Sequence, residues 1–157
     1  MRTLDDAYLG VVETLSTTLE NYPVVWALTG STSFALQGVP VTPNDVDVQT
    51  TEDGAYAIED AFQDRRIEPV SFSESETIRS HFGAFDFDGV RVELMGAVQK
   101  RLPDGTWEPP VDVTDHRIFV HVKDTSVPVL SLEYEATAYE RLGRTDRAAL
   151  LWEYATK

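Results

Sequence analysis

The sequence contains no cysteine among its 157 residues. This absence excludes disulfide bonds, thiolate zinc sites and cysteine nucleophiles. Histidine is also scarce, because only His81, His116 and His121 could supply an imidazole ligand, and they are too scattered along the sequence to indicate a metal cluster. Neither residue type therefore indicates a metal centre.

Long apolar runs are absent as well. No apolar stretch approaches the ~20 residues that a helix needs to span a bilayer, and the opening MRTLDDAYLG lacks the apolar core of a signal peptide. We therefore expect a cytoplasmic protein without a membrane partner. The length suits a single domain with a sizeable core, over residues 1–157.

Basic residues are few, since 13 Lys and Arg stand against 27 Asp and Glu, which gives a net charge of −14. Such a surface repels phosphate backbones and disfavours nucleic acid as a partner. We interpret the acidity as a solvated surface, of the kind that also accompanies adaptation to high salt. The densest basic stretch, YERLGRTDRAA, carries Arg141, Arg144 and Arg147 near the C-terminal end.

Hydrophobic periodicity predicts alternating helices and strands in the first 65 residues. Thr3 is the expected N-cap of the first helix, and Pro40 and Pro43 indicate a loop. The predicted elements are helices over 4–20, 31–38 and 52–65 and strands over 22–30 and 45–50.

The second part of the chain is rich in predicted strands, followed by two helices. The sequence FDFDGVRVE carries the Asp-Gly signature of a tight hairpin turn, and Ser131, Gly143 and Thr145 supply the caps and the break of the final helices. The strands are predicted over 68–73, 81–96 and 117–122 and the helices within 131–156. This order predicts an α+β (or α/β) fold with a mixed β-sheet flanked by helices.

Two carboxylates stand out in the predicted strand DVDVQT. Asp45 and Asp47 are separated by one residue, so on a strand their side chains project to the same side. Two carboxylates held that close raise the pKa of one of them and reduce stability, unless a cation lies between them. Oxygen ligands of this kind suit Mg²⁺. The alternative is a strand whose polar face points into water.

A second feature precedes the aspartates. Gly30 ends an apolar strand, and Ser31 and further small hydroxyl residues of a short helix follow it, an arrangement that can present backbone N–H groups to an anion. Ser31 or Ser33 can add a hydroxyl donor. A capped strand-to-helix turn explains the same residues. Together with the aspartates, however, the layout fits a metal-bound triphosphate.

The stretch WALTGSTSFALQGVPVTPNDVDVQTT resembles the DNA polymerase β-like nucleotidyltransferases, particularly their minimal and aminoglycoside-nucleotidyltransferase-like members. The resemblance covers a core from about residue 23 to 97 and, loosely, residues 127–151, with C-terminal helices over about 131–156. It implies an enzyme that binds an NTP such as ATP with two Mg²⁺ ions. Such an enzyme transfers the nucleoside monophosphate to a hydroxyl acceptor, either a small molecule or a protein.

The resemblance also implies a third carboxylate on a neighbouring strand. Glu93 in GVRVELMG is the preferred candidate, although aspartate is more usual there; Asp86 and Asp88 compete but flank the predicted hairpin turn. On this interpretation Asp45, Asp47 and Glu93 are the catalytic and metal-binding residues.

One departure from the family concerns the C-terminal part. Relatives often carry a lysine where this chain has Tyr139. Either Arg144 or Arg141 then takes over the contact with the nucleotide phosphates, or this contact is missing. Two alternatives stay open. The chain is a non-catalytic nucleotide-binding or toxin–antitoxin-type module with a protein partner or as a homodimer, or it is a structural α/β module with solvent-facing aspartates.

Overall fold

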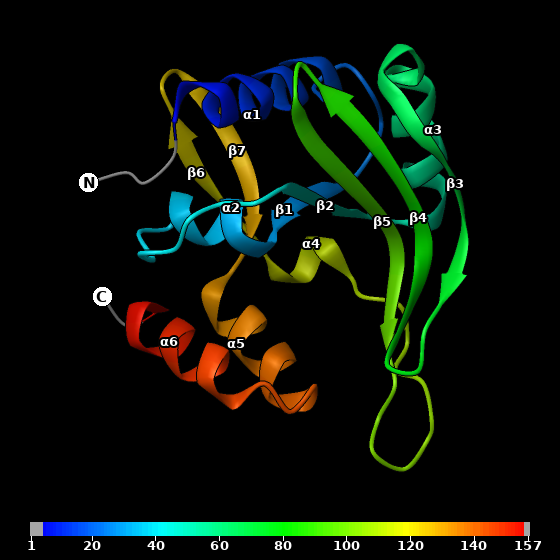
Figure 1. Ribbon diagram of the computed structural model, residues 1–157, viewed down its shortest axis with the longest axis vertical. Coiled ribbons are helices and arrows are strands. Elements are labelled where there is room, and N and C mark those ends of the chain that lie inside the picture. The colour runs from blue at the N-terminus through cyan, green and yellow to red at the C-terminus, as the bar shows by residue number, and fades with distance from the viewer. Residues whose placement is uncertain (1–4, 156–157) are drawn as a thin grey trace.

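The computed structural model describes residues 5–155, which form a mixed seven-stranded sheet flanked by helices (Figure 1). The strands follow one another across the sheet in the order β3-β4-β5-β2-β1-β7-β6. Their bounds are β1 Trp26–Thr29, β2 Val46–Thr50, β3 Arg66–Glu74, β4 Ile78–Phe87, β5 Val90–Lys100, β6 Arg117–Val122 and β7 Thr125–Leu130.

The centre of the sheet mixes both strand orientations. Strand β2 runs antiparallel to β1 but parallel to β5, and β1 also pairs in parallel with β7. The outer strands β3, β4 and β5 form an antiparallel meander, and β6 and β7 form a hairpin. The expected α+β fold with a mixed sheet is therefore confirmed.

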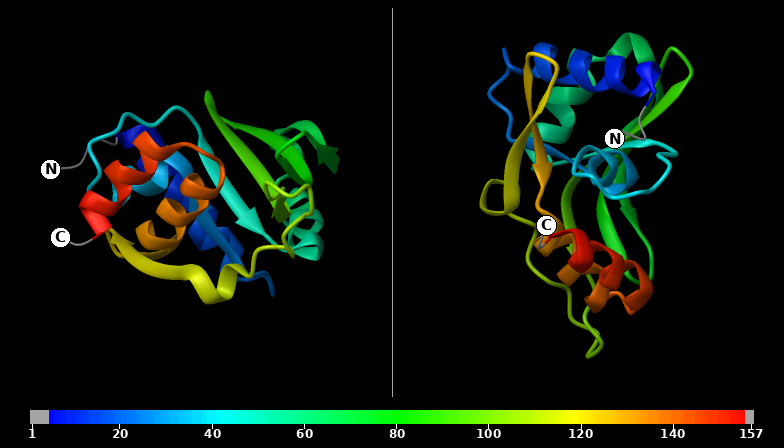
Figure 2. Two further views of the ribbon diagram at one scale, coloured as in Figure 1. Left: turned by 90° about the horizontal axis from the view of Figure 1, so that it is seen from below. Right: turned by 90° about the vertical axis from the view of Figure 1, so that its left-hand side faces the viewer.

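Two pairs of helices lie at opposite ends of the molecule, and the short helices α2 and α4 lie between them (Figures 1 and 2). Helices α1 and α3 contact each other and the sheet, whereas α5 and α6 lie side by side at the other end. The helix bounds are α1 Asp6–Leu19, α2 Gly30–Leu36, α3 Glu52–Ala61, α4 Val113–His116, α5 Leu132–Arg141 and α6 Thr145–Ala155.

Apolar side chains from both layers fill the main core. Val12 and Leu15 of α1 meet Leu28, Val48 and Leu94 of the central strands, and all five are at most 1% exposed. The alternation in β2 and β5 explains this core, because every second side chain faces the helices. The opposite side chains of the same two strands remain available for a site.

Several element boundaries differ from those the sequence predicts. The first helix begins after Asp5, whose side chain accepts a hydrogen bond from the Tyr8 N–H. The predicted cap Thr3 lies outside the described residues. Strand β1 covers only part of the predicted strand, and Gly30 opens α2 rather than ending β1. Strand β7 and the short helix α4 are absent from the sequence-based prediction.

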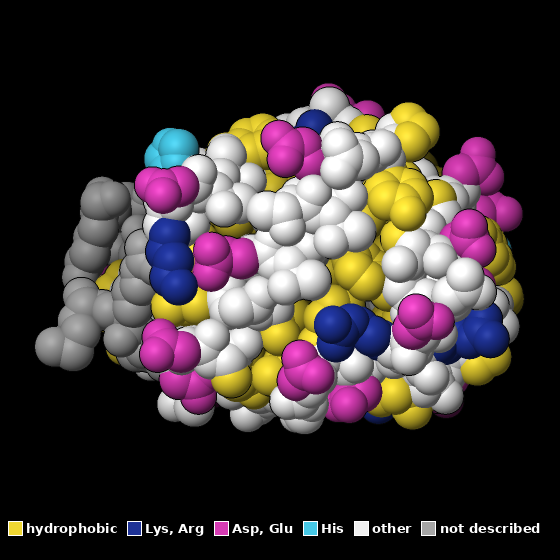
Figure 3. All heavy atoms as spheres, turned by 90° about the horizontal axis from the view of Figure 1, so that it is seen from above, with side chains coloured by type: hydrophobic (Ala, Val, Ile, Leu, Met, Phe, Trp, Pro, Cys, Tyr) yellow, Lys and Arg dark blue, Asp and Glu magenta, His cyan; other side chains and the backbone are white. Residues whose placement is uncertain are grey.

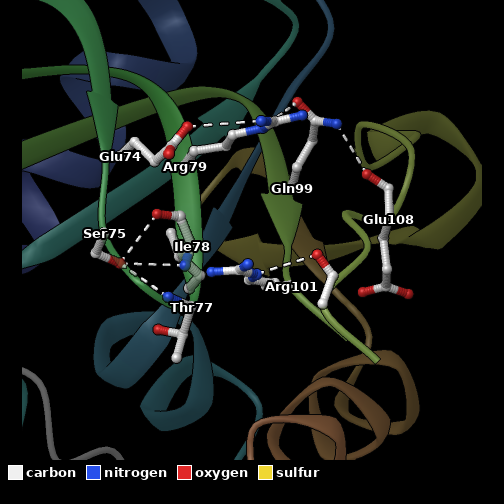
Figure 4. Close-up of polar contacts among 9 residues, drawn as sticks. Glu74, Ser75, Thr77, Ile78, Arg79, Gln99, Arg101 and Glu108 are labelled. Carbon is white, nitrogen blue, oxygen red and sulfur yellow. Dashed lines mark hydrogen bonds and ion pairs between the residues drawn. The ribbon is translucent and has the colours of Figure 1, made fainter. Parts of the chain in front are cut away.

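Polar contacts fasten the far end of the β4–β5 hairpin (Figure 4). Arg79 pairs with Glu74 at 3.5 Å and donates to the Gln99 side chain, and Gln99 donates to the backbone carbonyl of Glu108. The Arg79 guanidinium also lies 4.4 Å from the centre of the Trp107 ring. These contacts join the adjacent ends of β3, β4 and β5 to the segment that carries Trp107 and Glu108.

Acidic side chains are spread over the face shown in Figure 3 rather than gathered in one patch. This distribution agrees with the interpretation of the −14 charge as a solvated surface. Within residues 5–155, no helix combines the length and the apolar character needed to cross a membrane.

Candidate functional site

The three candidate carboxylates come from two neighbouring strands. Asp47 of β2 lies directly opposite Glu93 of the parallel strand β5, and Asp45 immediately precedes β2. One carboxylate oxygen from each residue lies within 4.8 Å of the others, and all three residues are half-buried. The structure thus brings together Asp45, Asp47 and Glu93.

The competing aspartates lie elsewhere. Asp86 is exposed and accepts a hydrogen bond from the Gly89 N–H at the β4–β5 turn. Asp88 pairs with Arg65 at 3.7 Å and is almost fully exposed. Asp88 also has a positive φ of 54°, as the tight Asp-Gly turn requires. Both residues therefore serve the turn, and Glu93 is the third acid of the cluster.

The Asp47 carboxylate is poorly compensated by the protein. Its Oδ1 atom is buried and has no hydrogen-bond partner among the described residues. Burial, followed by the charges of Glu93 and Asp45, raises the pKa of Asp47 to about 7. An orphaned buried oxygen beside two further carboxylates is the donor set that Mg²⁺ prefers, so these residues fit a magnesium ion.

Arg91 provides part of the missing positive charge. Its Nε donates to Glu93 Oε2 at 2.8 Å, from the same side of β5. The hydrogen bond and the charge of Glu93 raise the pKa of the Arg91 guanidinium. The guanidinium therefore neutralises Glu93, but it does not supply a hydrogen-bond partner for Asp47 Oδ1.

Gly30, the first residue of α2, lies against the Asp47 side chain. Its φ of +75° lies in the left-handed region, and a Cβ placed there would lie 2.4 Å from Asp47 Oδ2. Only glycine combines this backbone conformation with that spacing. The position of the Asp47 carboxylate thus explains why a glycine stands at residue 30.

The predicted anion-binding role of the Gly30 N–H does not agree with the structure. This N–H donates to Glu135 Oε2 at 3.3 Å, and the Thr29 hydroxyl donates to the same oxygen at 2.6 Å. The N–H is therefore already occupied by a carboxylate of the chain itself. Ser31 stays close to the site, where its Oγ accepts a hydrogen bond from the Asn44 N–H and its hydroxyl hydrogen remains a potential donor.

Ser33 is not brought to the site. It lies on the buried side of α2, and its Oγ accepts a hydrogen bond from the Gln37 amide. The helical rotation of two residues from Ser31 turns it toward the interior, so its proposed contact with the nucleotide is not supported.

A small cavity opens next to Asp47. Its volume is about 190 Å³, and it lies between the β2–β5 face of the sheet and α5. Arg144 lines this cavity and stacks 4.8 Å from the centre of the Tyr139 ring. Arg141 instead pairs with Glu108 and lines a different cavity. Of the two arginines, Arg144 is the one that lies beside the carboxylate cluster.

Glu135 is a buried acid that the sequence analysis missed. Burial raises its pKa to about 7, although the hydrogen bonds from Thr29 and Gly30 and the charge of Lys100 act in the opposite direction. Nothing in its helical context, EYEATA, distinguishes it from a surface glutamate. Only the packing of α5 over the end of β1 reveals it.

Stability without metal should fall as the pH rises from about 4 to about 7. In this window Asp47 and Glu135 keep their protons in the folded chain but lose them in the unfolded chain, because their folded pKa values are raised to about 7. Thermal unfolding in EDTA at pH 5 and pH 8 measures the difference. The Glu135→Gln variant should be less sensitive to pH, and an equal slope in both proteins would contradict this assignment.

Comparisons with known proteins place this geometry in a family. Residues 11–155 match the family model of the aminoglycoside-2''-adenylyltransferases. The crystal structure of TM1012 from Thermotoga maritima, described as a candidate nucleotidyltransferase, is 47% identical with a TM-score of 0.87, over 99% of this chain and 96% of that chain. No protein with a curated description matches the chain in sequence.

Two more distant structures share the fold. The lincosamide antibiotic adenylyltransferase LnuA has 12% identity and a TM-score of 0.59, over 96% of this chain and 98% of that chain. The antibiotic-resistance factor ANT(2'')-Ia has 10% identity and a TM-score of 0.59, over 94% of this chain and 84% of that chain. The resemblance seen in the sequence is confirmed: the chain belongs to the aminoglycoside-2''-adenylyltransferase family of nucleotidyltransferases.

Proposed function

We propose that the chain is a Mg²⁺-dependent nucleotidyltransferase that transfers a nucleoside monophosphate from an NTP to a hydroxyl group of a small molecule or protein. The observation that carries this proposal is the convergence of Asp45, Asp47 and Glu93, with oxygens within 4.8 Å of one another. LnuA, which is named as a lincosamide antibiotic adenylyltransferase and was solved with lincomycin, supports a small-molecule acceptor.

The proposed roles follow from the positions of the side chains. Asp45 and Asp47 would hold an ion against the triphosphate, and the same two residues with Glu93 would hold a second ion near the acceptor. Bound Mg²⁺ would stabilise the negative charge that develops on the attacking and leaving oxygens. Ser31 and Arg144 lie where they could donate to phosphate oxygens.

The reaction would be an in-line displacement at the α-phosphorus. The bond from the acceptor oxygen to this phosphorus forms as the bond to the β-phosphate oxygen breaks, and pyrophosphate leaves. The acceptor proton would pass to the Glu93 carboxylate, which lies half-exposed at the edge of the cluster. Arg91 would hold that carboxylate in position through its 2.8 Å hydrogen bond.

Binding and transfer can be measured separately. Calorimetry with ATP should show binding that requires Mg²⁺, and incubation with labelled ATP and a panel of hydroxyl-bearing small molecules should yield a labelled nucleotidyl product and pyrophosphate. Binding without transfer to any acceptor would favour the non-catalytic module. The presence of Tyr139 where relatives often have a lysine is the observation that supports this alternative. The absence of any Mg²⁺-dependent binding would overturn the proposal.

A further inference from the structure

The cavity next to Asp47 contains polar groups that the proposed reaction does not use. Gln49 lies two residues after Asp47 on the same side of β2 and lines this cavity. The residue is 7% exposed, and its Oε1 atom is buried without a hydrogen-bond partner among the described residues. A buried amide oxygen without a donor is costly unless a ligand supplies one.

The walls of the cavity are mainly apolar. Ile78, Met95 and Val98 line it from the sheet, and Leu142 and the Tyr139 ring line it from the end of α5. Such walls suit a flat heteroaromatic ring better than a polyphosphate chain. The stacked Arg144–Tyr139 pair adds a further planar surface at the same opening.

Size and charge separate the possible occupants. At about 190 Å³ the cavity is below the roughly 300–1,000 Å³ of pockets that enclose drug-sized ligands, so a multi-ring acceptor does not fit inside. Its two cationic lining residues, Lys100 and Arg144, balance its two acidic ones, Asp47 and Glu135, so the cavity offers a polycationic acceptor no net attraction. Lys100 is 7% exposed, and the hydroxyl of Tyr134 at 3.3 Å is its hydrogen-bond partner.

The position of the cavity relative to the carboxylates also favours the nucleotide over the acceptor as its occupant. Asp47 lines it, whereas Asp45 and Glu93 are not among its lining residues. In the proposed reaction Glu93 faces the acceptor, so a cavity on the Asp47 side receives the donor nucleotide. The nucleoside of a bound NTP would then extend from the ions along β2 toward Gln49.

We propose that this cavity receives the nucleobase of the NTP and that Gln49 selects a base with an exocyclic amino group, as in adenine. The amide oxygen would accept a hydrogen bond from the amino group, which an otherwise similar base with a carbonyl at that position lacks. This inference rests on the proposed function, because it assigns one part of the same substrate.

ATP and inosine triphosphate provide the matched test, since their bases differ only at one edge of the ring, where a carbonyl and an N–H replace the amino group and the neighbouring ring nitrogen acceptor. We expect calorimetry of the full chain with Mg²⁺ to show ATP binding at least about tenfold tighter than inosine triphosphate. In Gln49→Leu this preference should disappear. Gln63→Leu is the control, because it removes the same amide from an exposed residue that follows α3 and does not line the cavity; it should keep the preference.

A second variant tests the cavity without removing a buried polar group. Leu142→Trp places a larger side chain on the opposite wall, and we expect it to weaken the binding of both nucleotides about equally. Equal affinity of the wild-type chain for the two nucleotides, an unchanged preference in Gln49→Leu, or unchanged binding in Leu142→Trp would overturn the inference while leaving the proposed function intact. If the wild-type chain shows no Mg²⁺-dependent binding of either nucleotide, both the inference and the proposed function are refuted.

Discussion

Replacing Asp47 by asparagine should reduce nucleotidyl transfer by a factor on the order of a thousand, because the proposed ions lose a charged ligand that they share. The amide keeps the shape of the side chain but not its negative charge. The variant should also lose the rise in melting temperature that Mg²⁺ is expected to give the wild-type chain. Steady-state transfer assays and thermal unfolding with and without Mg²⁺ measure these two effects.

The fold itself should tolerate this substitution. In the absence of metal the wild-type carboxylate is crowded by Glu93 and Asp45, and its Oδ1 atom is unpartnered. At pH 8 the melting temperature of metal-free Asp47→Asn should therefore equal or exceed that of the wild type. Asp86→Asn is the matched control, since it removes an aspartate at the β4–β5 turn, outside the cluster, and should retain activity. Full activity of Asp47→Asn would refute the proposed mechanism.

Among substitutions of small residues in the site, Gly30→Ala should cause the largest loss of stability and activity. Two effects add, since the φ of +75° is unfavourable for alanine and the new Cβ would lie 2.4 Å from Asp47 Oδ2. The backbone conformation alone costs roughly 1–2 kcal/mol. The contact must in addition displace the Asp47 carboxylate, so we expect both a lower free energy of unfolding and a severe loss of transfer.

Gly38→Ala separates these two effects. Gly38 also has a positive φ, +92°, but a Cβ there would meet nothing within 4 Å. Its alanine variant should lose about 1 kcal/mol of unfolding free energy while retaining transfer. Chemical denaturation and transfer assays on both variants make the comparison. If Gly30→Ala retained as much activity as Gly38→Ala, the close approach of Gly30 to Asp47 would have no functional role.

Local sequence patterns predicted much of the site. Alternation along DVDVQT places Asp45 and Asp47 together, and the same period of two could also have identified Gln49 and, beside Glu93, Arg91. The hairpin was predictable because Asp88 and Gly89 accept the positive φ values that a tight turn needs. Each of these predictions depends only on residues that are close together in the chain.

The edges of elements were less predictable. Gly30 follows an apolar run, which predicts the end of a strand, but it is the first residue of α2, and its N–H donates to Glu135 of the distant helix α5. Strand β7 is not predictable from its local pattern because Pro128 interrupts it. In the structure the strand forms an antiparallel hairpin with β6 and also pairs in parallel with β1, which is far away in the sequence. Long-range pairing overrides local preference in such segments.

The sequence by itself determined the family, the mixed α+β fold and the two aspartates on one side of a strand, because periodicity and short motifs are local properties. Tertiary structure alone decided which third acid joins them, since Glu93 meets Asp47 only through the β2–β5 register. It also decided that Ser33 is buried, that Glu135 holds the Gly30 N–H, and that Gln49 and Lys100 line one cavity. These relations depend on contacts between distant segments, and such contacts exist only once the chain has folded.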